Sequence, residues 1–335
     1  MPDSARPGDR RPTIEVCLTT YNSEPYLPAL LDSLFAQTRQ GFTLLIADDD
    51  STDGTRAIVE SYSKRFPGRI VQLPEGPRRG VIGNFDRVLA RADADYVFLC
   101  DHDDVWLPHK IEQSLEAMHA LEARHEPGVP LLVHTDLIIT GPRLEILGHS
   151  FFEYAGGDPL RNDLEEILLS NVVTGCTTVI NRPLRLQARP VPDEAMMHDH
   201  WLALVAATTG AIGFIDDATI LYRQHGRNAI GARRRRTSTF FQRVYGTLVS
   251  RERERVLKRY SRQAAVLLAR FGECMSPRHR AAVETLAGLW DKPRLSRFAA
   301  LRRCGLGLDG LARNLALFVV VTRADSSASG GADRP

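Results

Sequence analysis

The sequence has few cysteines and no long apolar run. Five cysteines occur among its 335 residues; they are scattered, odd in number and without C-x-x-C spacing, so neither a disulfide framework nor a zinc site is expected. No apolar stretch approaches the roughly 18 residues that a membrane-spanning helix needs. The polar N-terminus also lacks the apolar segment of a secretion signal. We therefore expect reduced thiols and a cytoplasmic location.

Two glycine-rich phosphate-binding motifs are missing as well. After the first expected strand there is no G-x-G-x-x-G, the motif of dinucleotide sites, and no G-x-x-x-x-G-K-[ST], the motif of P-loops. A nucleotide bound by this chain would therefore need another partner for its phosphates. A divalent metal ion held by carboxylates would provide one.

The charges are unevenly distributed along the chain. Residues 1–232 contain 21 Lys and Arg against 33 Asp and Glu, whereas residues 233–335 contain 22 against 8. Periodic apolar positions predict helices in this basic region. Two interpretations stay open: a platform that contacts anionic lipid at the inner face of a membrane, or an arginine-rich bundle that packs on the acidic part or forms a homodimer. Nucleic acid is not an expected partner, because no aromatic residues are interleaved with the basic ones.

Strand and helix patterns alternate over the first hundred residues. Strand-like apolar runs cover residues 13–19, 42–47, 69–73 and 96–100, and amphipathic helical patterns lie between them. This alternation predicts an α/β fold with a Rossmann-like, mostly parallel sheet flanked by helices, followed by a C-terminal helical appendage. Residues 1–12 and 324–335 are expected to be disordered.

Polar clusters follow three of these strands: Thr20-Tyr21-Asn22, Asp48-Asp49 and Asp101-x-Asp103. Ligands of parallel sheets bind beyond the carboxyl ends of the strands, so we expect the three clusters at one edge of the sheet. Tyr21 could stack on a base, and Asp48 could accept a hydrogen bond from one. Taken singly, each has a structural alternative, which is packing at a strand end for Tyr21 and helix capping for Asp48.

The last of these clusters is strongly acidic. Asp101, Asp103 and Asp104 follow the strand, and no Lys or Arg occurs before Lys110. In an extended backbone, Asp101 and Asp103 would point to the same side. Mg²⁺ or Mn²⁺ would relieve their repulsion and leave coordination positions for phosphates. The alternative is a solvated acidic turn.

Three stretches occur in the order found in one known family. VCLTTYNSEPYLPALLDSLFAQT, LLIADDDSTDGT and DYVFLCDHDDVWLPHKIE resemble family 2 glycosyltransferases of the GT-A fold, especially rhamnosyltransferase-like bacterial enzymes that build surface polysaccharides. The resemblance implies inverting, metal-dependent transfer of a sugar from a nucleoside diphosphate sugar, UDP or dTDP rather than GDP, to a glycan or lipid-linked glycan. Residues 13–110 would bind the donor and residues 111–231 the acceptor, with residues 232–323 as the basic helical region.

The resemblance also assigns roles in the first half of the chain. The base of the donor would be held by Thr20, Tyr21, Glu24 and Asp48, and Asn22 would also belong to the donor-binding residues. Asp101 would bind the ribose or the metal, and Asp103 the metal. Asp50 departs from the family, because many members carry Gly or another small residue there, and it would crowd or tune the nucleotide pocket.

Further roles fall in the second half. Gly175 interrupts an apolar run where family members bring the backbone close to the donor sugar; a plain β-bulge is the alternative. Asp199 matches the catalytic base of the family, although His198 replaces the usual Glu before it. A carboxylate in that place can take the proton of the attacking sugar hydroxyl. The alternative for Asp199 is a helix N-cap flanked by surface histidines. Asp136 resembles an acceptor-side position.

The last expected strand ends in YRQHGRN. We expect His225 to be the third metal ligand and Arg223 or Arg227 to contact phosphates. The Q-x-x-R-W motif of processive polysaccharide synthases is missing, so one sugar is expected per encounter. Two other classes stay open: a sugar-phosphate nucleotidyltransferase, although the loop TTYNSEPY lacks the glycine-rich character of that class, and a non-catalytic nucleotide-binding scaffold that acts through its basic region.

Overall fold

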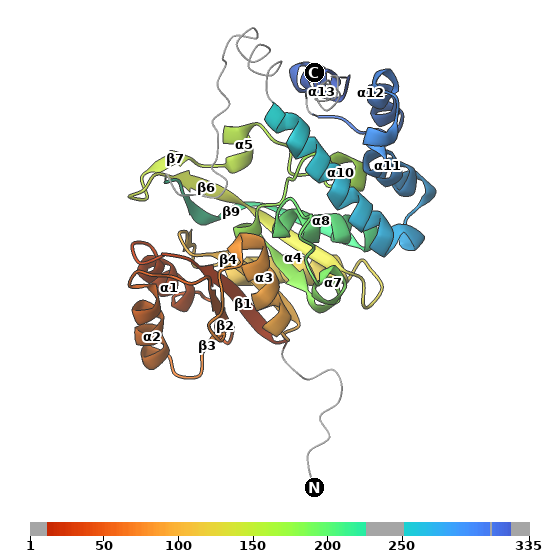
Figure 1. The fold of residues 1–335 in the computed structure, drawn as a ribbon. Helices are drawn as coiled ribbons and strands as arrows, with labels where there is room; N and C mark the ends of the chain where they lie inside the picture. Colours follow the sequence, from red (N-terminus) through yellow and green to blue (C-terminus); the bar gives the residue numbers. More distant parts are fainter. Residues whose placement is uncertain (1–11, 226–250, 309, 323–335) are drawn as a thin grey trace, which may run out of the picture. The chain divides into compact units, whose positions relative to one another are not determined.

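The computed structural model describes residues 12–225, 251–308 and 310–322, which fall into two compact units (Figure 1). Described residues within 1–162 and 171–235 form the first unit, which contains the sheet. Residues 163–170 and the described residues within 236–335 form the second unit, which is helical.

The first half of unit 1 alternates strands and helices, as the sequence predicts. Strands β3, β2, β1 and β4 lie side by side in that order, and all three pairings are parallel. Their bounds are β1 Ile14–Thr20, β2 Thr43–Asp48, β3 Ile70–Gln72 and β4 Tyr96–Asp101. The helices between them are α1 Leu27–Phe35, α2 Thr55–Arg65 and α3 Gly80–Arg91. Helix α3 packs against β1 and β2.

The second half of unit 1 extends the same sheet to nine strands and makes it mixed. The order continues from β4 as β8-β6-β9-β5, with β7 paired to β6. Strand β9 runs parallel to β6, while β8, β7 and β5 pair antiparallel with their neighbours. The elements are β5 Val105–Trp106, α4 Lys110–Glu122, β6 Leu131–Thr140, β7 Ile146–Gly148, α5 Phe151–Ala155, η1 Gly175–Thr177, β8 Val179–Asn181, α7 Arg182–Ala188, α8 His198–Thr209 and β9 Ala211–Arg223.

Apolar side chains of the sheet and its helices form one core. Alternate residues of the strands, such as Val16, Leu18 and Phe98, are fully buried together with Leu27, Leu30 and Leu34 of α1. The apolar spacing of α1 therefore places one helical face on the sheet. Burial of this surface is the main favourable contribution to folding, and it leaves the polar strand ends at the edge of the core.

The strand register confirms that the polar clusters share one edge. Thr20 at the end of β1 pairs with Asp48 at the end of β2, and Thr19 pairs with Asp101 at the end of β4. Because the three strands are parallel, their carboxyl ends and the loops that follow lie next to one another.

The described residues of unit 2 form short and long helices. These are α6 Leu164–Ile167, α10 Arg251–Phe271, η2 Gly272–Cys274, α11 Pro277–Ala287, η3 Leu289–Asp291, α12 Arg294–Arg303 and α13 Leu311–Thr322. Ser276 caps α11, because its side chain accepts a hydrogen bond from the His279 amide. Among the helices of the described ranges, none has both the length and the apolar character required to cross a membrane.

Candidate active site

Asp48, at the end of β2, is held by a network of hydrogen bonds. Its carboxylate accepts from Thr20 Oγ1 at 2.8 Å, from Ser51 Oγ at 2.6 Å and from Arg56 Nε at 3.1 Å. Burial raises the pKa of Asp48, but the hydrogen bonds from Ser51, Thr20 and Arg56 outweigh burial and keep that pKa below its ordinary value. Asp48 therefore carries a fixed negative charge at this edge of the sheet.

Two more predicted residues join the loop after β1 to the loop after β2. Asn22 Oδ1 accepts from the Thr52 amide at 2.9 Å, and Glu24 Oε2 accepts from the Gly54 amide at 2.8 Å. Both loops are thus locked together by side chain to backbone bonds. The Tyr21 ring lies beneath the guanidinium carbon of Arg78 at 3.9 Å from the ring centroid, so this ring already has a cationic stacking partner.

Asp50 adopts a backbone conformation that favours glycine. Its φ is 67°, in the left-handed region, where a side chain with a Cβ is disfavoured. The resemblance places Gly or another small residue here in many family members, and the backbone supplies a physical reason for that choice.

The acidic loop after β4 differs from the expected geometry. Residues 102–103 form a turn instead of continuing the strand, so the prediction that an extended backbone aligns Asp101 with Asp103 is wrong. The Asp103 carboxylate instead meets His225, with Nε2 and Oδ2 2.8 Å apart. The His225 ring also stacks on Tyr26, with ring centroids 4.6 Å apart.

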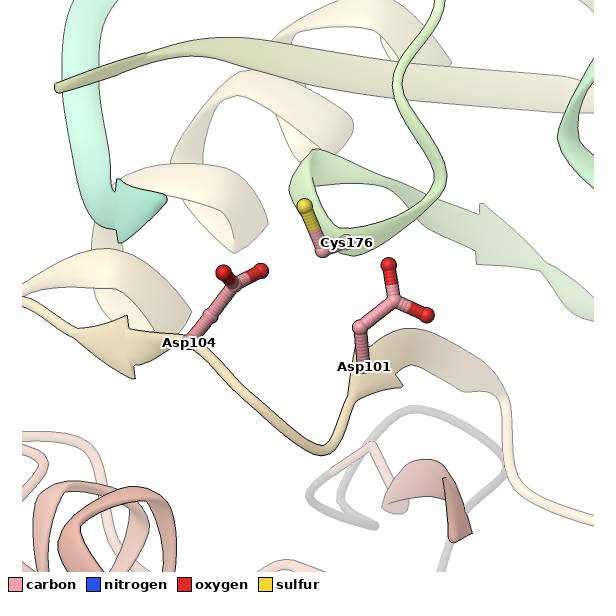
Figure 2. A group of neighbouring side chains, drawn as sticks. All are labelled: Asp101, Asp104 and Cys176. Carbon is pink, nitrogen blue, oxygen red and sulfur yellow. The ribbon is translucent and has the colours of Figure 1, made fainter. Parts of the chain in front are cut away.

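A second group of donors lies beside this pair. Figure 2 shows Asp101, Asp104 and Cys176 turned toward one another from two segments, and one ligand atom of each lies within 4.8 Å of the others. Lys110 is fully buried nearby, where its ammonium donates to the Thr177 carbonyl at 3.2 Å. A buried cation close to buried carboxylates offsets part of their charge.

Burial and mutual repulsion raise the pKa values of two carboxylates in the acidic loop. Burial, the negative charge of Asp103 and that of Asp199 raise the pKa of Asp101 to about 8. Burial and the same kind of repulsion, from Asp103 and Asp101, raise the pKa of Asp104 well above its ordinary value. A divalent cation would remove this penalty, because it supplies the positive charge that the loop lacks.

The donor chemistry fits Mn²⁺ or Mg²⁺. Carboxylate oxygens suit these hard ions, and Asp101 and Asp103 provide them. The imidazole of His225 is a softer ligand, which binds Mn²⁺ more readily than Mg²⁺. Burial raises the pKa of the Cys176 thiol well above its ordinary value, with Asp104 and Asp101 adding to the effect. That thiol therefore stays protonated and is a poor ligand. The metal roles of the three residues stay predictions.

Asp199 lies in the first turn of α8 and is buried. Its Oδ2 accepts from the Gly175 amide at 2.9 Å and its Oδ1 from Asn171 Nδ2 at 3.1 Å. Burial raises the pKa of Asp199 to about 6, against the opposing effect of the hydrogen bonds from the His200 and Gly175 amides. Gly175, whose amide binds Asp199, is followed by Cys176, whose sulfur lies within 4.8 Å of an Asp101 carboxylate oxygen, so the two carboxylates flank the same short segment.

The structural alternatives for Asp199 and Gly175 are wrong. The N-cap of α8 is Met197, not Asp199, and His198 and His200 are buried, not on the surface. Gly175 begins the 3-10 helix η1 and is not part of a β-bulge. A Cβ at Gly175 would lie 2.9 Å from His198 Nε2, so the absence of a side chain here makes room for the front of α8.

His198 occupies an unusual environment. Its ring stacks on Phe85 with centroids 3.6 Å apart, and neither ring nitrogen has a hydrogen-bond partner among the described residues. Burial lowers its pKa to about 3. The residue that replaces the usual Glu is therefore neutral, and it adds no charge next to Asp199.

Arg223 has clear structural contacts. Its Nε donates to the Asp103 carbonyl at 2.8 Å, and one terminal nitrogen donates to the Pro142 carbonyl at 2.7 Å. Its amide donates to Asp104 Oδ1 at 3.0 Å. These bonds fix the acidic loop to the end of β9, while a phosphate contact by Arg223 stays a prediction. Arg227 lies outside the described residues.

Asp136 lines a pocket of about 500 Å³ between β6, β9 and α5. Its Oδ1 accepts from the Phe151 amide at 2.9 Å and from the Leu137 amide at 2.7 Å. Three further carboxylates and several apolar side chains complete the lining, among them Glu153, Asp216, Asp217, Phe152 and Phe214. The acceptor-side role of Asp136 stays a prediction.

Sequence reasoning missed Lys110, Asn171 and Cys176. Lys110 follows a loop and begins an amphipathic helix, where a lysine normally faces solvent. Asn171 and Cys176 lie in a segment of weak periodicity. The odd cysteine count gave no spacing signal, so only their three-dimensional neighbours reveal these residues.

Comparisons with known proteins identify a family. Residues 15–178 match the family model described as Glycosyl transferase family 2. The dTDP-rhamnosyl transferase RfbG of Shigella flexneri is 26% identical over 230 residues, which cover 64% of this chain and 74% of RfbG.

Two solved structures share the fold. The mannosyltransferase PcManGT of Pyrobaculum calidifontis, in complex with GDP-Man and Mn²⁺, superposes with a TM-score of 0.54 and 17% identity, covering 89% of this chain and 74% of that one. S. aureus TarS 1-349, in complex with UDP-GlcNAc, gives a TM-score of 0.52 and 19% identity, covering 87% and 79%. At these identities the likeness concerns the α/β fold of GT-A glycosyltransferases.

Proposed function

Since this chain belongs to glycosyltransferase family 2, we propose that it is an inverting, metal-dependent enzyme that adds one sugar per encounter to a glycan or lipid-linked glycan. The donor is a nucleoside diphosphate sugar, with dTDP or UDP preferred to GDP. The name of RfbG, a dTDP-rhamnosyl transferase, supports dTDP as the nucleotide of the donor. Family membership removes the nucleotidyltransferase alternative, since that class catalyses a different transfer.

One observation carries the mechanism: Asp199 is a buried carboxylate with a pKa of about 6, held by the Gly175 amide and placed within electrostatic reach of Asp101. A base of this kind is ionised near neutral pH and still basic enough to accept a proton. Fixed hydrogen bonds keep the carboxylate in one orientation, which favours a single line of attack.

The proposed step is an in-line displacement. The acceptor hydroxyl oxygen forms a bond to the anomeric carbon, and the bond from that carbon to the diphosphate oxygen breaks. The hydroxyl proton passes to Asp199, and the nucleoside diphosphate leaves with the electron pair. Attack from the face opposite the leaving group inverts the configuration.

Other residues of the chain bind the donor. Thr20, Asn22, Glu24 and Asp48 shape the nucleotide pocket between the loops after β1 and β2. Asp101, Asp103 and His225 would hold the cation, which neutralises the charge that develops on the departing diphosphate. Arg223 keeps Asp103 and Asp104 in place through its bonds to the loop.

Release of nucleoside diphosphate tests this proposal. Purified protein is incubated with UDP-, dTDP- and GDP-sugars, with and without Mn²⁺, and the nucleotide products are quantified. We expect release from one donor class, dependent on the metal and lost in Asp199→Asn. The anomeric configuration of the product, read by NMR, decides between inversion and retention. No release from any donor would favour the scaffold interpretation.

A further inference from the structure

Helices α12 and α13 of unit 2 present an apolar stripe to solvent. Leu311, Leu315 and Phe318 recur at intervals of four and three along α13, so they share one face. Their exposed fractions are 74%, 43% and 44%, and Leu295 of α12 is 86% exposed. Large exposed apolar side chains that cluster in this way mark an interaction surface more often than chance.

The two helices join their exposed residues into one patch. Phe298 of α12 and Phe318 of α13 are in edge-to-face contact, with ring centroids 5.3 Å apart. Leu295 lies one helical turn before Phe298, and Leu315 one turn before Phe318. We call Leu295, Phe298, Leu311, Leu315 and Phe318 the α12–α13 patch.

The other face of α13 is already used inside unit 2. Ala316, Leu317, Val320 and Val321 are buried, and α13 packs against α12 and α10. The patch is therefore not the side on which unit 2 builds its own core. Its exposed side chains are available for a different contact.

Charge identifies the kind of partner. Helices α12 and α13 contain five arginines and no Asp or Glu: Arg294, Arg297, Arg302, Arg303 and Arg313. Arg302, Arg303 and Arg313 are exposed. A second copy of the same face would bring like charges together, which opposes self-association. A partner surface that is both apolar and anionic would contact the exposed apolar side chains and the arginines of these helices together.

We propose that the α12–α13 patch docks on anionic lipid, with its leucines and phenylalanines entering the apolar layer of the membrane surface and the exposed Arg302, Arg303 and Arg313 beside it contacting lipid phosphates. This is the behaviour of an interfacial helix pair, which lies on a bilayer without crossing it. The contact does not depend on the proposed transfer chemistry. It would bring the enzyme to the place where a lipid-linked acceptor resides.

Vesicle flotation of the full chain tests the proposal. Vesicles of phosphatidylcholine alone are compared with vesicles of equal parts phosphatidylcholine and phosphatidylglycerol. We expect the protein to float only with the anionic vesicles, and to dissociate at high salt. The triple variant L311S/L315S/F318S is expected to lose flotation. The double variant R302Q/R303Q should bind roughly thirtyfold more weakly, from about 1 kcal/mol for each arginine near an anionic surface.

Matched variants separate this contact from general effects. Leu160 and Leu186 are also exposed leucines, in unit 1, and L160S/L186S should float as the wild type does. Circular dichroism melts establish that each variant is folded. Donor hydrolysis, measured without vesicles, should be equal in all of them, so a failure of flotation is distinguishable from a failure of the proposed chemistry.

Three results would overturn the proposal. Equal flotation with neutral and anionic vesicles would show that the arginines do not contribute to binding through anionic lipid. Flotation retained by the folded triple variant would assign membrane binding to another part of the chain. A wild-type dimer that becomes monomeric in the triple variant, without flotation of either, would make the patch an interface between copies of this chain.

Discussion

The amide of Gly175 donates a hydrogen bond of 2.9 Å to Asp199 Oδ2. A Cβ at Gly175 would lie 2.9 Å from His198 Nε2 and 3.4 Å from Asp199 Oδ2. Both neighbouring side chains are buried and His198 is stacked on Phe85, so neither can move aside easily. The position of the proposed base thus depends on a glycine that is distant in sequence.

Gly175→Ala should therefore impair transfer more than it impairs folding. The added methyl group displaces His198 or Asp199, and a displacement near 1 Å costs on the order of a hundredfold in rate. Steady-state release of nucleoside diphosphate measures the loss. The control is Gly76→Ala, where the nearest atom would be an Arg87 nitrogen at 3.5 Å, and near-normal turnover in Gly175→Ala would contradict the arrangement.

The pH dependence of transfer should report Asp199. Because burial raises its pKa to about 6, the carboxylate is protonated at lower pH and cannot accept the acceptor proton. We expect kcat to be half-maximal near pH 6 and to level off above about pH 7. Asp199→Asn should lower kcat by roughly 10²–10⁴-fold and abolish this inflection. A variant that keeps the same inflection would show that another group is titrating.

The parts of the site predicted from sequence are those that follow from periodicity. Alternating strand and helix patterns imply parallel strands, and parallel strands bring their carboxyl ends together, so Thr20, Asp48 and Asp101 were correctly expected at one edge. The register alone determines this result. No side-chain contact had to be known.

Contacts between distant segments were beyond the reach of the sequence. The Arg223 amide binds Asp104 across 119 residues, and Asn171 binds Asp199 from an irregular segment. Hydrogen bonds between distant segments leave no repeating pattern in the sequence from which they could be predicted. The turn at residues 102–103 was missed for a related reason, because the run of acids resembles a continuation of the strand until His225 and Arg223 are seen to hold it.

Asp101→Asn should stabilise the metal-free protein at neutral pH. The pKa of Asp101 rises from an ordinary value of 3.8 to about 8 on folding, so folding takes up a proton between these values. The free energy of unfolding therefore falls as pH increases from about 4 and levels off above about 8. Asn carries no charge at any of these pH values. The melting temperature of Asp101→Asn should therefore exceed that of the wild type at pH 7 and match it near pH 4.

Bound Mn²⁺ should remove the stability advantage of Asp101→Asn over the wild type. Saturating Mn²⁺ is expected to raise the wild-type melting temperature and to have little effect on Asp101→Asn. A stability difference that does not vary with pH would show that the ionisation of Asp101 is not its cause.

His225 and Asp103 should contribute to Mn²⁺ affinity as a pair. Their side chains are 2.8 Å apart, and we expect both to bind the ion. Thermal shift titrations should show that Asp103→Asn loses most of the response to Mn²⁺. His225→Gln should weaken Mn²⁺ affinity by at least roughly 10–100-fold, which is the loss typical when a residue that only orients a metal ligand is removed. His109→Gln is the control, since His109 is exposed and pairs with Glu112. Equal Mn²⁺ responses in His225→Gln and His109→Gln would exclude His225 as a ligand.

Asp50→Gly should increase stability. Asp50 has a φ of 67°, and its carboxylate contacts Arg56 at 3.3 Å with both side chains well exposed, so the ion pair adds little. Gly relieves the strain of the left-handed conformation, which stabilises the folded protein. It also gives the unfolded chain more conformational entropy, which offsets part of that gain. The net result is an increase of about 0.5–1 kcal/mol in the free energy of unfolding. Urea denaturation measures it. Asp50→Ala removes the same carboxylate but keeps a Cβ, so it should not be stabilising; if both variants gained equally, the backbone conformation would not be the cause.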